Sequence, residues 1–324
     1  MIHMVIKITL LLVFFAVMVG IGLYCRKHAT DVNGFVLGGR SVGPWLTAFA
    51  YGTSYFSAVV FVGYAGQFGW KYGIAATWAG IGNALLGSLL AWAVLGRRTR
   101  IMSQHLNSAT MPEFFGKRFG SKSLKIAASV IIFIFLIPYT ASLYNGLSRL
   151  FGMAFHIDYS LCVIVMAVLT GVYVIAGGYM ATAINDFIQG IIMIFGICAV
   201  IAAVLHSQGG FMAALEGLAQ VQDPEVSQAP GVFASFFGPD PMNLLGVVLL
   251  TSLGTWGLPQ MVQKFYAIKD EKAIDTGMVI STVFAALVAG GCYFLGGFGR
   301  LFSDKVDLAA GGYDSIIPTM LSGL

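Results

Sequence analysis

The chain has 324 residues, of which 58% are apolar and only 10% are charged, and its formal net charge is +4. A soluble globular domain carries about 25% charged residues, and a chain with so few charges cannot cover a water-facing surface. The composition therefore excludes a soluble globular protein and indicates an integral membrane protein. The basic residues are scattered between apolar runs, which argues against nucleic acid as a partner.

Nothing in the sequence indicates catalysis. No Walker A, GxSxG or HExxH motif is present. The four cysteines are Cys25, Cys162, Cys198 and Cys292, without a CxxC pair, so neither a disulfide framework nor a zinc cluster is expected. The five histidines lie at the termini or near the ends of apolar runs, without a paired carboxylate or nucleophile. We expect no enzyme activity and no organic cofactor.

Eight apolar runs approach or exceed the roughly 20 residues that a helix needs to cross a bilayer of about 30 Å. They are Val5–Tyr24, Val42–Phe68, Ile74–Leu95, Leu124–Leu147, Tyr159–Ala176, Ala183–Leu205, Asn243–Tyr266 and Thr276–Phe298. The alternating pattern of a membrane barrel strand is absent from them, so we expect helices. The first run is followed by Arg26, Lys27 and His28 and not by a cleavage site, so it is read as a span.

The basic residues predict the orientation, because cytoplasmic loops carry an excess of Lys and Arg. With the N-terminus outside, the inward side holds Arg26, Lys27, Arg40, Arg97, Arg98, Arg100, Lys117, Arg118, Lys122, Lys125, Lys264, Lys269 and Lys272. The outside holds Lys7, Lys71, Arg149, Arg300 and Lys305. We expect a multi-pass protein of the cell membrane with its N-terminus outside.

The second and seventh runs are unusual for membrane helices. The second has hydroxyl side chains around Gly52, and the seventh has hydroxyls with two glycines and Pro259 at the same relative depth. Glycine and proline weaken the helical hydrogen bonding, and carbonyls freed at membrane depth must line a cavity or be buried in protein. Close helix packing is the alternative for either run alone. Two interrupted helices five spans apart predict an inverted-repeat transporter with its site at the interruptions.

Asp186 is an ionisable residue near the inner end of the sixth run. A carboxylate inside a membrane segment usually faces the bundle interior and marks an ion or proton path. The alternative is a residue at the membrane interface that caps or anchors the helix. The residues alone leave these two interpretations equally open.

Three ordered motifs resemble the sodium:solute symporter family, and more specifically its proline and pantothenate permeases. They are Phe35-Val36-Leu37-Gly38-Gly39-Arg40-Ser41, the Gly177-Gly178 stretch leading to Asp186 and Gln189, and Gly257-Leu258-Pro259-Gln260 ahead of Lys264 and Phe265. The resemblance covers nearly the whole chain from about Asp31 to Leu321. It implies a five-plus-five inverted-repeat fold preceded by one extra helix.

The resemblance divides the chain into segments. It implies an extra N-terminal membrane helix over residues 1–30 and a first five-helix repeat over residues 31–206. An outside loop over residues 207–242 then precedes the start of a second repeat over residues 243–324. Family members have thirteen or so spans, so we expect an N-terminal portion of a longer carrier, truncated after about eight helices. The alternative is a natural short protein that closes its site by self-association.

The family's sodium site lies at the break of the first core helix. The resemblance assigns sodium binding to the carbonyls of Thr53 and Phe56 and to the side chain of Ser57. The carboxylate matching Asp186 belongs to a further sodium site in some members. Arg40 matches a basic residue at the cytoplasmic entry to the first core helix and implies gating or coupling.

The solute in this family lies beside the sodium, and the matching candidates are Tyr55, Tyr139, Thr251, Thr255 and Trp256. Proline carriers place an aspartate at Tyr55, a Trp at Thr251 and a Tyr at Thr255, which argues against proline. Some stretches, such as Ile316-Ile317-Pro318-Thr319, look more like the pantothenate branch.

We expect a sodium-coupled symporter that imports a small organic solute, an amino acid or a carboxylate such as pantothenate or proline, by alternating access. Its expected partners are the solute, Na⁺ as coupling ion and the lipid bilayer, while the oligomeric state is not indicated. The alternatives are an uncoupled facilitator or channel, or a fragment that is not functional on its own.

Overall fold

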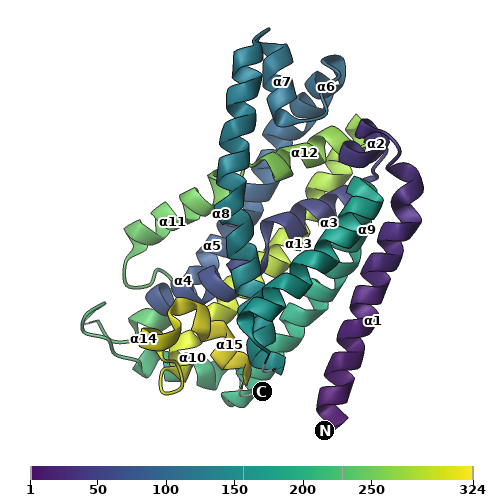
Figure 1. The fold of residues 1–324 in the computed structure, drawn as a ribbon. Coiled ribbons are helices and arrows are strands. Elements are labelled where there is room, and N and C mark those ends of the chain that lie inside the picture. The colour runs from purple at the N-terminus through teal and green to yellow at the C-terminus, as the bar shows by residue number, and fades with distance from the viewer. Residues whose placement is uncertain (1, 156, 228, 323–324) are drawn as a thin grey trace. The chain divides into compact units, whose positions relative to one another are not determined.

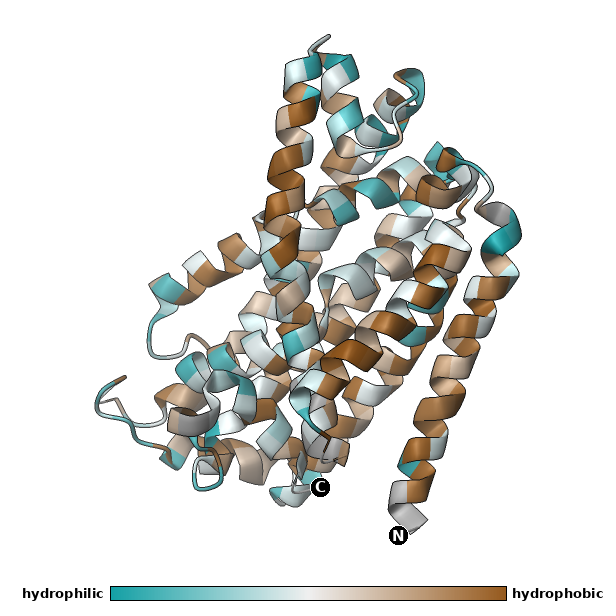
Figure 2. Cartoon of the chain, viewed as in Figure 1, coloured by the Kyte–Doolittle hydropathy of each residue, from teal (hydrophilic) through white to brown (hydrophobic). Residues whose placement is uncertain are grey.

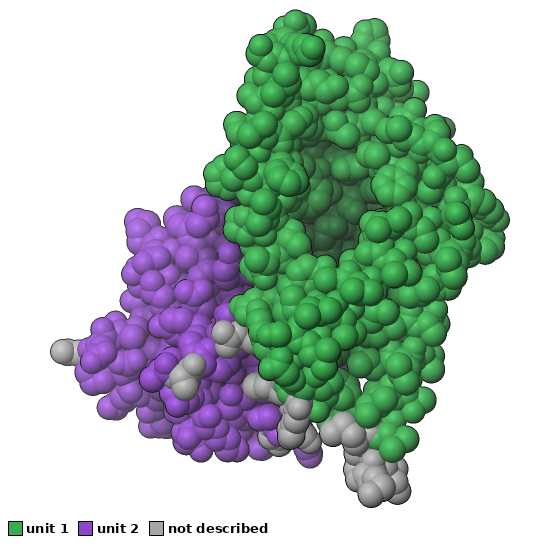
Figure 3. All heavy atoms as spheres, viewed as in Figure 1, with its two compact units in different colours: residues 1–54, 92–190, 257–280 green, residues 55–91, 191–256, 281–324 purple. Residues whose placement is uncertain are grey.

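The computed structural model describes residues 2–155, 157–227 and 229–322. These residues form helices and loops, and their only β pairings are two isolated bridges, Val42 with Ile268 and Asp223 with Ser227. The chain folds as two compact units, each assembled from three stretches (Figure 3). Unit 1 contains residues 1–54, 92–190 and 257–280, and unit 2 contains residues 55–91, 191–256 and 281–324.

The helices follow one another in the order shown in Figure 1. The α-helices are α1 Ile2–Cys25, α2 Val32–Leu37, α3 Pro44–Tyr55, α4 Ala65–Tyr72, α5 Thr77–Gly82, α6 Arg97–His105, α7 Met111–Arg118, α8 Lys122–Phe155, α9 Tyr159–Ser207, α10 Phe211–Gln220, α11 Pro241–Leu253, α12 Pro259–Ala267, α13 Glu271–Gly296, α14 Leu308–Gly311 and α15 Ile316–Ser322. Three segments have the wider turns of a π-helix: Val59–Tyr64, Asn83–Leu90 and Trp92–Gly96. Short 3-10 turns cover Arg26–His28, Gly38–Arg40, Gly73–Ala76, Val232–Ala234, Gly299–Phe302 and Tyr313–Ser315.

The long helices are apolar, and three of them are also largely exposed along their length. Within the described residues, five helical segments are long and apolar enough to cross a membrane: Val5–Cys25, Val59–His105, Lys122–Ser148, Tyr159–Ser207 and Glu271–Gly296. Figure 2 shows α1 and α9 as predominantly apolar along their length. In water such faces would be unfavourable, whereas in a bilayer they are solvated by lipid. The structure therefore confirms a multi-pass helical membrane protein.

The fifth and sixth predicted spans are joined in the 49-residue element α9. Gly178 interrupts it with φ +57° and ψ −150°, a conformation that L side chains rarely adopt. A Cβ atom at Gly178 would lie 2.8 Å from the Phe35 carbonyl oxygen. Only glycine allows both this backbone turn and this close approach. The element therefore consists of two helical parts that meet at Gly178.

Both predicted helix interruptions are present. Helix α3 ends at Tyr55, Phe56 and Ser57 are not helical, and the helical conformation resumes at Ala58. Residues 254–258 separate α11 from α12, which begins at Pro259. Proline suits the first position of a helix because its missing N–H would have had no intrahelical partner there.

The buried side chain of Arg100 links separate segments of unit 1. The Arg100 side chain donates from Nε to the Ile268 carbonyl at 2.6 Å and from Nη2 to the Lys269 carbonyl at 3.0 Å. Val42 pairs with the same segment, because its N–H donates to the Ala267 carbonyl at 3.3 Å. These bonds join the start of the α3 region to α6 and to the end of α12. Arg100, expected as an inward-facing surface charge, is only 5% exposed and is structural.

The stretch predicted as an outside loop contains its own helix, α10 (Phe211–Gln220), followed by irregular chain. Asp223 in this stretch pairs with Arg300 Nη1 at 3.0 Å. Arg300 also donates from Nε to the Trp70 carbonyl at 2.6 Å, and its guanidinium lies 3.9 Å from the centre of the Phe233 ring. The buried Arg300 side chain thus links this stretch to the rest of unit 2.

Helices α4 and α13 of unit 2 pack closely against each other at glycine residues. A Cβ atom on Gly69 in α4 would overlap the backbone of Gly296 in α13, and one on Gly296 would overlap the carbonyl of Ala65. Small residues at such crossings let two membrane helices pack backbone to backbone. The contact leaves no room for even a methyl group.

We predict that Gly69→Ala lowers the thermal midpoint of the protein in detergent by several degrees, because overpacking costs about 1–3 kcal/mol. Gly246→Ala in α11 is the matched control, since a Cβ there meets nothing within 4 Å. It is expected to leave the midpoint unchanged or slightly raised. Equal midpoints for the two variants, measured by thermal unfolding, would contradict the packing.

Candidate ion and solute site

The predicted sodium ligands at the first interruption are divided between the two units. The Thr53 hydroxyl donates to the carbonyls of Phe49 at 2.9 Å and of Ala50 at 3.4 Å, so it is bonded to its own helix. The Ser57 carbonyl accepts from the N–H groups of Val60 and Phe61 and starts the next helical segment. Thr53 belongs to unit 1, whereas Phe56 and Ser57 belong to unit 2. Their joint coordination of sodium stays a prediction.

Asp186 faces a buried lysine inside unit 1. Its Oδ2 atom lies 3.7 Å from Nζ of Lys264, and the two side chains are 21% and 8% exposed, respectively. The Thr53 side chain lies near the Asp186 carboxylate. Because α9 continues on both sides of Asp186, the carboxylate does not cap a helix. This placement favours the interior interpretation and brings two predicted sodium residues, Thr53 and Asp186, together.

Lys264 is a functional candidate that was counted from the sequence only among the basic residues of the inward side. It lies in α12, and its Nζ is 5.1 Å from the centre of the Tyr179 ring in addition to its pairing with Asp186. The signal that could have revealed it is its position five residues after Pro259, within the helix that follows the second interruption. Lys264 thus places its amino group next to the Asp186 carboxylate.

Several buried polar groups near this ion pair lack a hydrogen-bond partner among the described residues. They are both amide atoms of Asn185, both amide atoms of Gln260 and the Tyr179 hydroxyl. Asn185 adjoins Asp186, and Gln260 lies one helical turn before Lys264. Buried polar groups are normally satisfied by protein, water or ligand. The chemistry of this donor and acceptor set suits water molecules or a partly hydrated cation.

Unit 2 gathers the hydroxyl groups of the two interruptions on one asparagine. The Oδ1 atom of Asn83, a residue 1% exposed, accepts from Tyr55 Oη, Thr251 Oγ1 and Ser252 Oγ, each at 3.1 Å. The Tyr55 hydroxyl also lies 2.7 Å from the Thr251 carbonyl. Two predicted solute residues, Tyr55 and Thr251, are therefore joined through Asn83. The sequence reasoning missed Asn83, although an amide within an apolar run was a usable signal.

The remaining residues of the second interruption lie beside the same segment. Trp256 Nε1 donates to the Leu86 carbonyl at 2.9 Å, and Thr255 Oγ1 donates to the Ser252 carbonyl at 2.9 Å. The segment Asn83–Leu90 is π-helical, and such wide turns are frequent at functional sites. Tyr55, Thr251, Thr255 and Trp256 thus form one group in unit 2.

Tyr139 belongs to unit 1, where it follows Pro138 in α8 and its carbonyl accepts from Ser142 Oγ at 2.7 Å. Its role beside the solute stays a prediction.

Arg40 joins three segments of unit 1. Its guanidinium donates to the Ser108 carbonyl at 2.7 Å, to the Tyr266 carbonyl at 3.2 Å and to Ser103 Oγ at 3.2 Å. Burial and the nearby charge of Arg100 lower the pKa of Arg40. The Arg40 backbone has φ +56°, which is uncommon for a residue with a side chain. The arrangement makes Arg40 a structural link at the entry to α3, and its role in gating stays a prediction.

Comparison with known proteins places the chain among transporters. It matches the sodium:solute symporter family over residues 35–317. It is 30% identical over 300 residues to the osmoregulated proline transporter OpuE of Bacillus subtilis (strain 168), an alignment that covers 92% of this chain and 59% of that protein. It is 31% identical over 268 residues to a sodium/proline symporter of Staphylococcus aureus (strain JH9), covering 81% of this chain and 50% of the relative.

The fold is similar to that of a Na⁺-coupled sialic acid symporter in a substrate-bound, outward-open state, with a TM-score of 0.76 at 15% identity. That alignment covers 98% of this chain and 65% of the symporter. The chain thus spans between half and two thirds of the length of these three proteins. All three are transporters and none is an enzyme. The chain belongs to the sodium:solute symporter family.

Proposed function

We propose that the chain supplies the ion- and solute-binding core of a sodium-coupled symporter, which imports a small organic solute by alternating access. The observation that carries this proposal is the pair of interrupted helices, at residues 56–57 and 254–258. Interrupted helices at membrane depth expose carbonyls and helix ends that bind ions and polar solutes in transporters. Membership of the sodium:solute symporter family supports the same function.

Sodium is the proposed coupling ion, because it is a small hard cation that prefers carbonyl and hydroxyl oxygens. The proposed ligands are the carbonyls of Thr53 and Phe56 and the side chain of Ser57, with the carboxylate of Asp186 at a further sodium site. The proximity of Thr53 to Asp186 in unit 1 supports part of this set. One sodium crossing 100 mV releases about 2.3 kcal/mol, and a tenfold gradient adds about 1.4 kcal/mol. Together these drive a solute accumulation of a few hundredfold.

The proposed solute is an amino acid or a carboxylate such as proline or pantothenate. Two of the relatives are named as proline transporters, and the structural neighbour binds sialic acid. The group of Tyr55, Thr251, Thr255 and Trp256 in unit 2 offers hydroxyl and indole donors to such a solute, with Tyr139 of unit 1 as a further candidate. The positive-inside distribution of Lys and Arg supports a cell-membrane protein with its N-terminus outside.

Uptake into proteoliposomes tests the coupling. Accumulation of labelled proline, pantothenate and related solutes is expected with an inward sodium gradient and is expected to stop when choline replaces sodium. Counterflow without a sodium requirement would instead identify an uncoupled facilitator.

Ser57→Ala is predicted to raise the half-saturating sodium concentration about tenfold, because the loss of one oxygen ligand to a charge costs about 1.5 kcal/mol. Sodium titration of uptake and equilibrium sodium binding both measure the shift. Ser54→Ala removes a hydroxyl from α3 that is not a proposed ligand and serves as the control. Unchanged sodium dependence in Ser57→Ala would remove Ser57 from the site.

Lys264→Met is predicted to make thermal stability depend more strongly on sodium than in the wild-type protein. The substitution leaves the partly buried Asp186 carboxylate without its counter-charge, which costs about 3 kcal/mol, and bound sodium restores part of that loss. The double variant Asp186→Asn with Lys264→Met has no charge left to pair, and its stability is expected to depend on sodium no more than that of the wild-type protein. Thermal unfolding in sodium and in choline measures the difference. A single variant that ignores sodium would contradict sodium binding at Asp186.

Asn83→Ala is predicted to raise the KM for the solute several-fold and to destabilise the protein by about 1–3 kcal/mol, because the Ser252 hydroxyl loses its acceptor and the Tyr55 and Thr251 hydroxyls lose the partner that joins them. Ser88→Ala is the matched control, since it breaks a buried hydrogen bond of 2.8 Å to Ser281 in the same π-helical segment. Ser88→Ala is expected to lower stability without changing KM. The same change in KM in both variants would show that Asn83 acts only through stability.

A further inference from the structure

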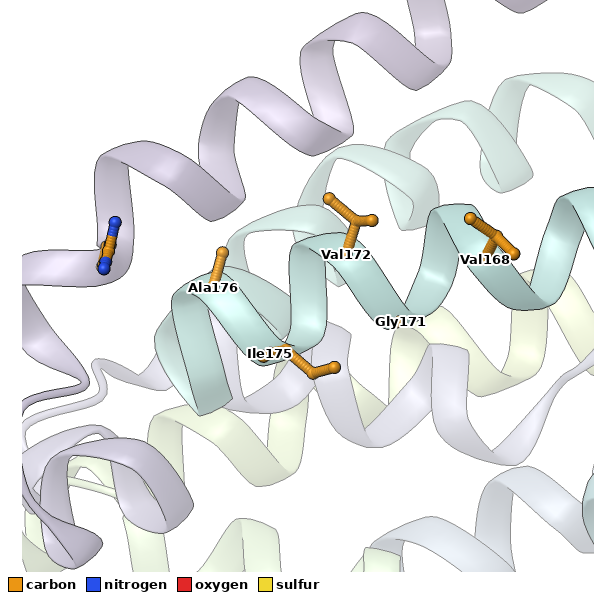
Figure 4. A pocket seen from close by; sticks show the side chains of 6 residues that line it. Val168, Gly171, Val172, Ile175 and Ala176 are labelled. Carbon is orange, nitrogen blue, oxygen red and sulfur yellow. The ribbon is translucent and has the colours of Figure 1, made fainter.

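An open apolar groove of about 580 Å³ runs along the surface of unit 1. It is lined by Arg26, Val168, Gly171, Val172, Ile175 and Ala176. Figure 4 shows Val168, Val172 and Ala176 pointing from the same face of α9. The residues that line the groove are distant in sequence from both helix interruptions. Neither the proposed sodium site nor the proposed solute site includes them.

Small residues create the groove. A Cβ atom on Gly22 in α1 would lie 2.8 Å from the Tyr173 side chain and 2.9 Å from its backbone, so α1 packs closely on α9 at this point. Arg26 follows one helical turn after Gly22, at the end of α1. Gly171 contributes no side chain, and a Cβ there would meet nothing within 4 Å. The close approach of α1 to α9 and the absence of a side chain at Gly171 leave an open groove beside the contact between the two helices.

The dimensions of the groove match one leaflet of a bilayer. Its lining on α9 extends from Val168 to Ala176, which is about 12 Å along a helix. Half of a bilayer core of about 30 Å is about 15 Å. Three of the lining residues are largely exposed: Val168 at 59%, Val172 at 46% and Ile175 at 76%. The groove therefore suits an acyl chain of one leaflet, whereas a membrane-spanning helix would extend well beyond it.

A cation marks one end of the groove. Arg26 lies in the turn Arg26–His28 that follows α1, and none of the ion pairs among the described residues includes it. The neighbouring Lys27 instead places its Nζ 4.2 Å from the centre of the Tyr24 ring. An exposed guanidinium is well suited to a phosphate group, because its planar fork binds two phosphate oxygens at once.

We propose that this groove binds an anionic phospholipid, with the phosphate group on Arg26 and one acyl chain along Val168, Val172 and Ile175. Charge complementarity selects the lipid, since a basic side chain at the membrane surface attracts anionic headgroups. The apolar lining holds the chain by excluding it from water at the interface. The bound lipid fills the space between α1 and α9 and stabilises their contact.

Native mass spectrometry of the purified chain, with phosphatidylglycerol and with phosphatidylcholine added, tests the proposal. The wild-type protein is expected to retain phosphatidylglycerol in preference to phosphatidylcholine. Arg26→Gln is expected to reduce that preference about fivefold, the effect of one basic residue at a membrane surface. Val172→Trp is expected to reduce the retention of both lipids, because the indole fills the groove.

Lys27→Gln is the matched control, because it removes the same charge from the adjacent residue, which does not line the groove. Its lipid preference is expected to equal that of the wild-type protein. Equal losses in Arg26→Gln and Lys27→Gln would reduce the effect to general surface charge and overturn the proposal. Retention unchanged by Val172→Trp, or no lipid retained by the wild-type protein because another helix or a second copy covers the groove, would also overturn it.

Discussion

A helix that stops inside a bilayer leaves backbone donors and acceptors without water to satisfy them. The chain contains two such stops, after Tyr55 and after Leu253. This constraint explains the polar groups around both stops. At the first stop the Ser57 carbonyl starts the next helical segment. At the second, Pro259 removes one donor that would otherwise lack a partner. Asn83 collects the hydroxyl groups of unit 2 around these ends.

Charges inside the protein are paired in a consistent way. Arg40 and Arg100 donate to backbone carbonyls at the ends of helices in unit 1, and Arg300 does the same in unit 2. Asp186 and Lys264 instead pair with each other, at a distance longer than a strong hydrogen bond. The arginines therefore act as structural links through short hydrogen bonds, whereas the Asp186 carboxylate has a more distant charged partner. The side-chain amides of Asn185 and Gln260, which lie near this pair, likewise have no hydrogen-bond partner among the described residues.

Family membership and the residues at the interruptions bear on different parts of the function. The family match concerns transport, and it extends over residues 35–317. The solute depends on a few side chains, and here Tyr55, Thr251 and Thr255 differ from the residues that proline carriers place at these positions, although the named relatives carry proline. Replacing a carboxylate by a phenol changes which charge the site tolerates. The group of Tyr55, Thr251, Thr255 and Trp256 in unit 2 is therefore where we propose that solute specificity is decided.

The sequence by itself determined the membrane class, the helical character, both interruptions and the family, because hydrophobic length, glycine and proline act locally along the chain. The eight predicted spans differ from the five long apolar helical segments of the described residues. Only the tertiary structure showed that Asp186 faces Lys264, that Asn83 joins Tyr55 to Thr251, and that Arg100 is buried against carbonyls. These partners are separated by tens to hundreds of residues, and no periodic pattern links them. Lys264 was predicted only as a basic residue of the inward side, because sequence shows a residue's position along a helix but not which neighbour its side chain faces.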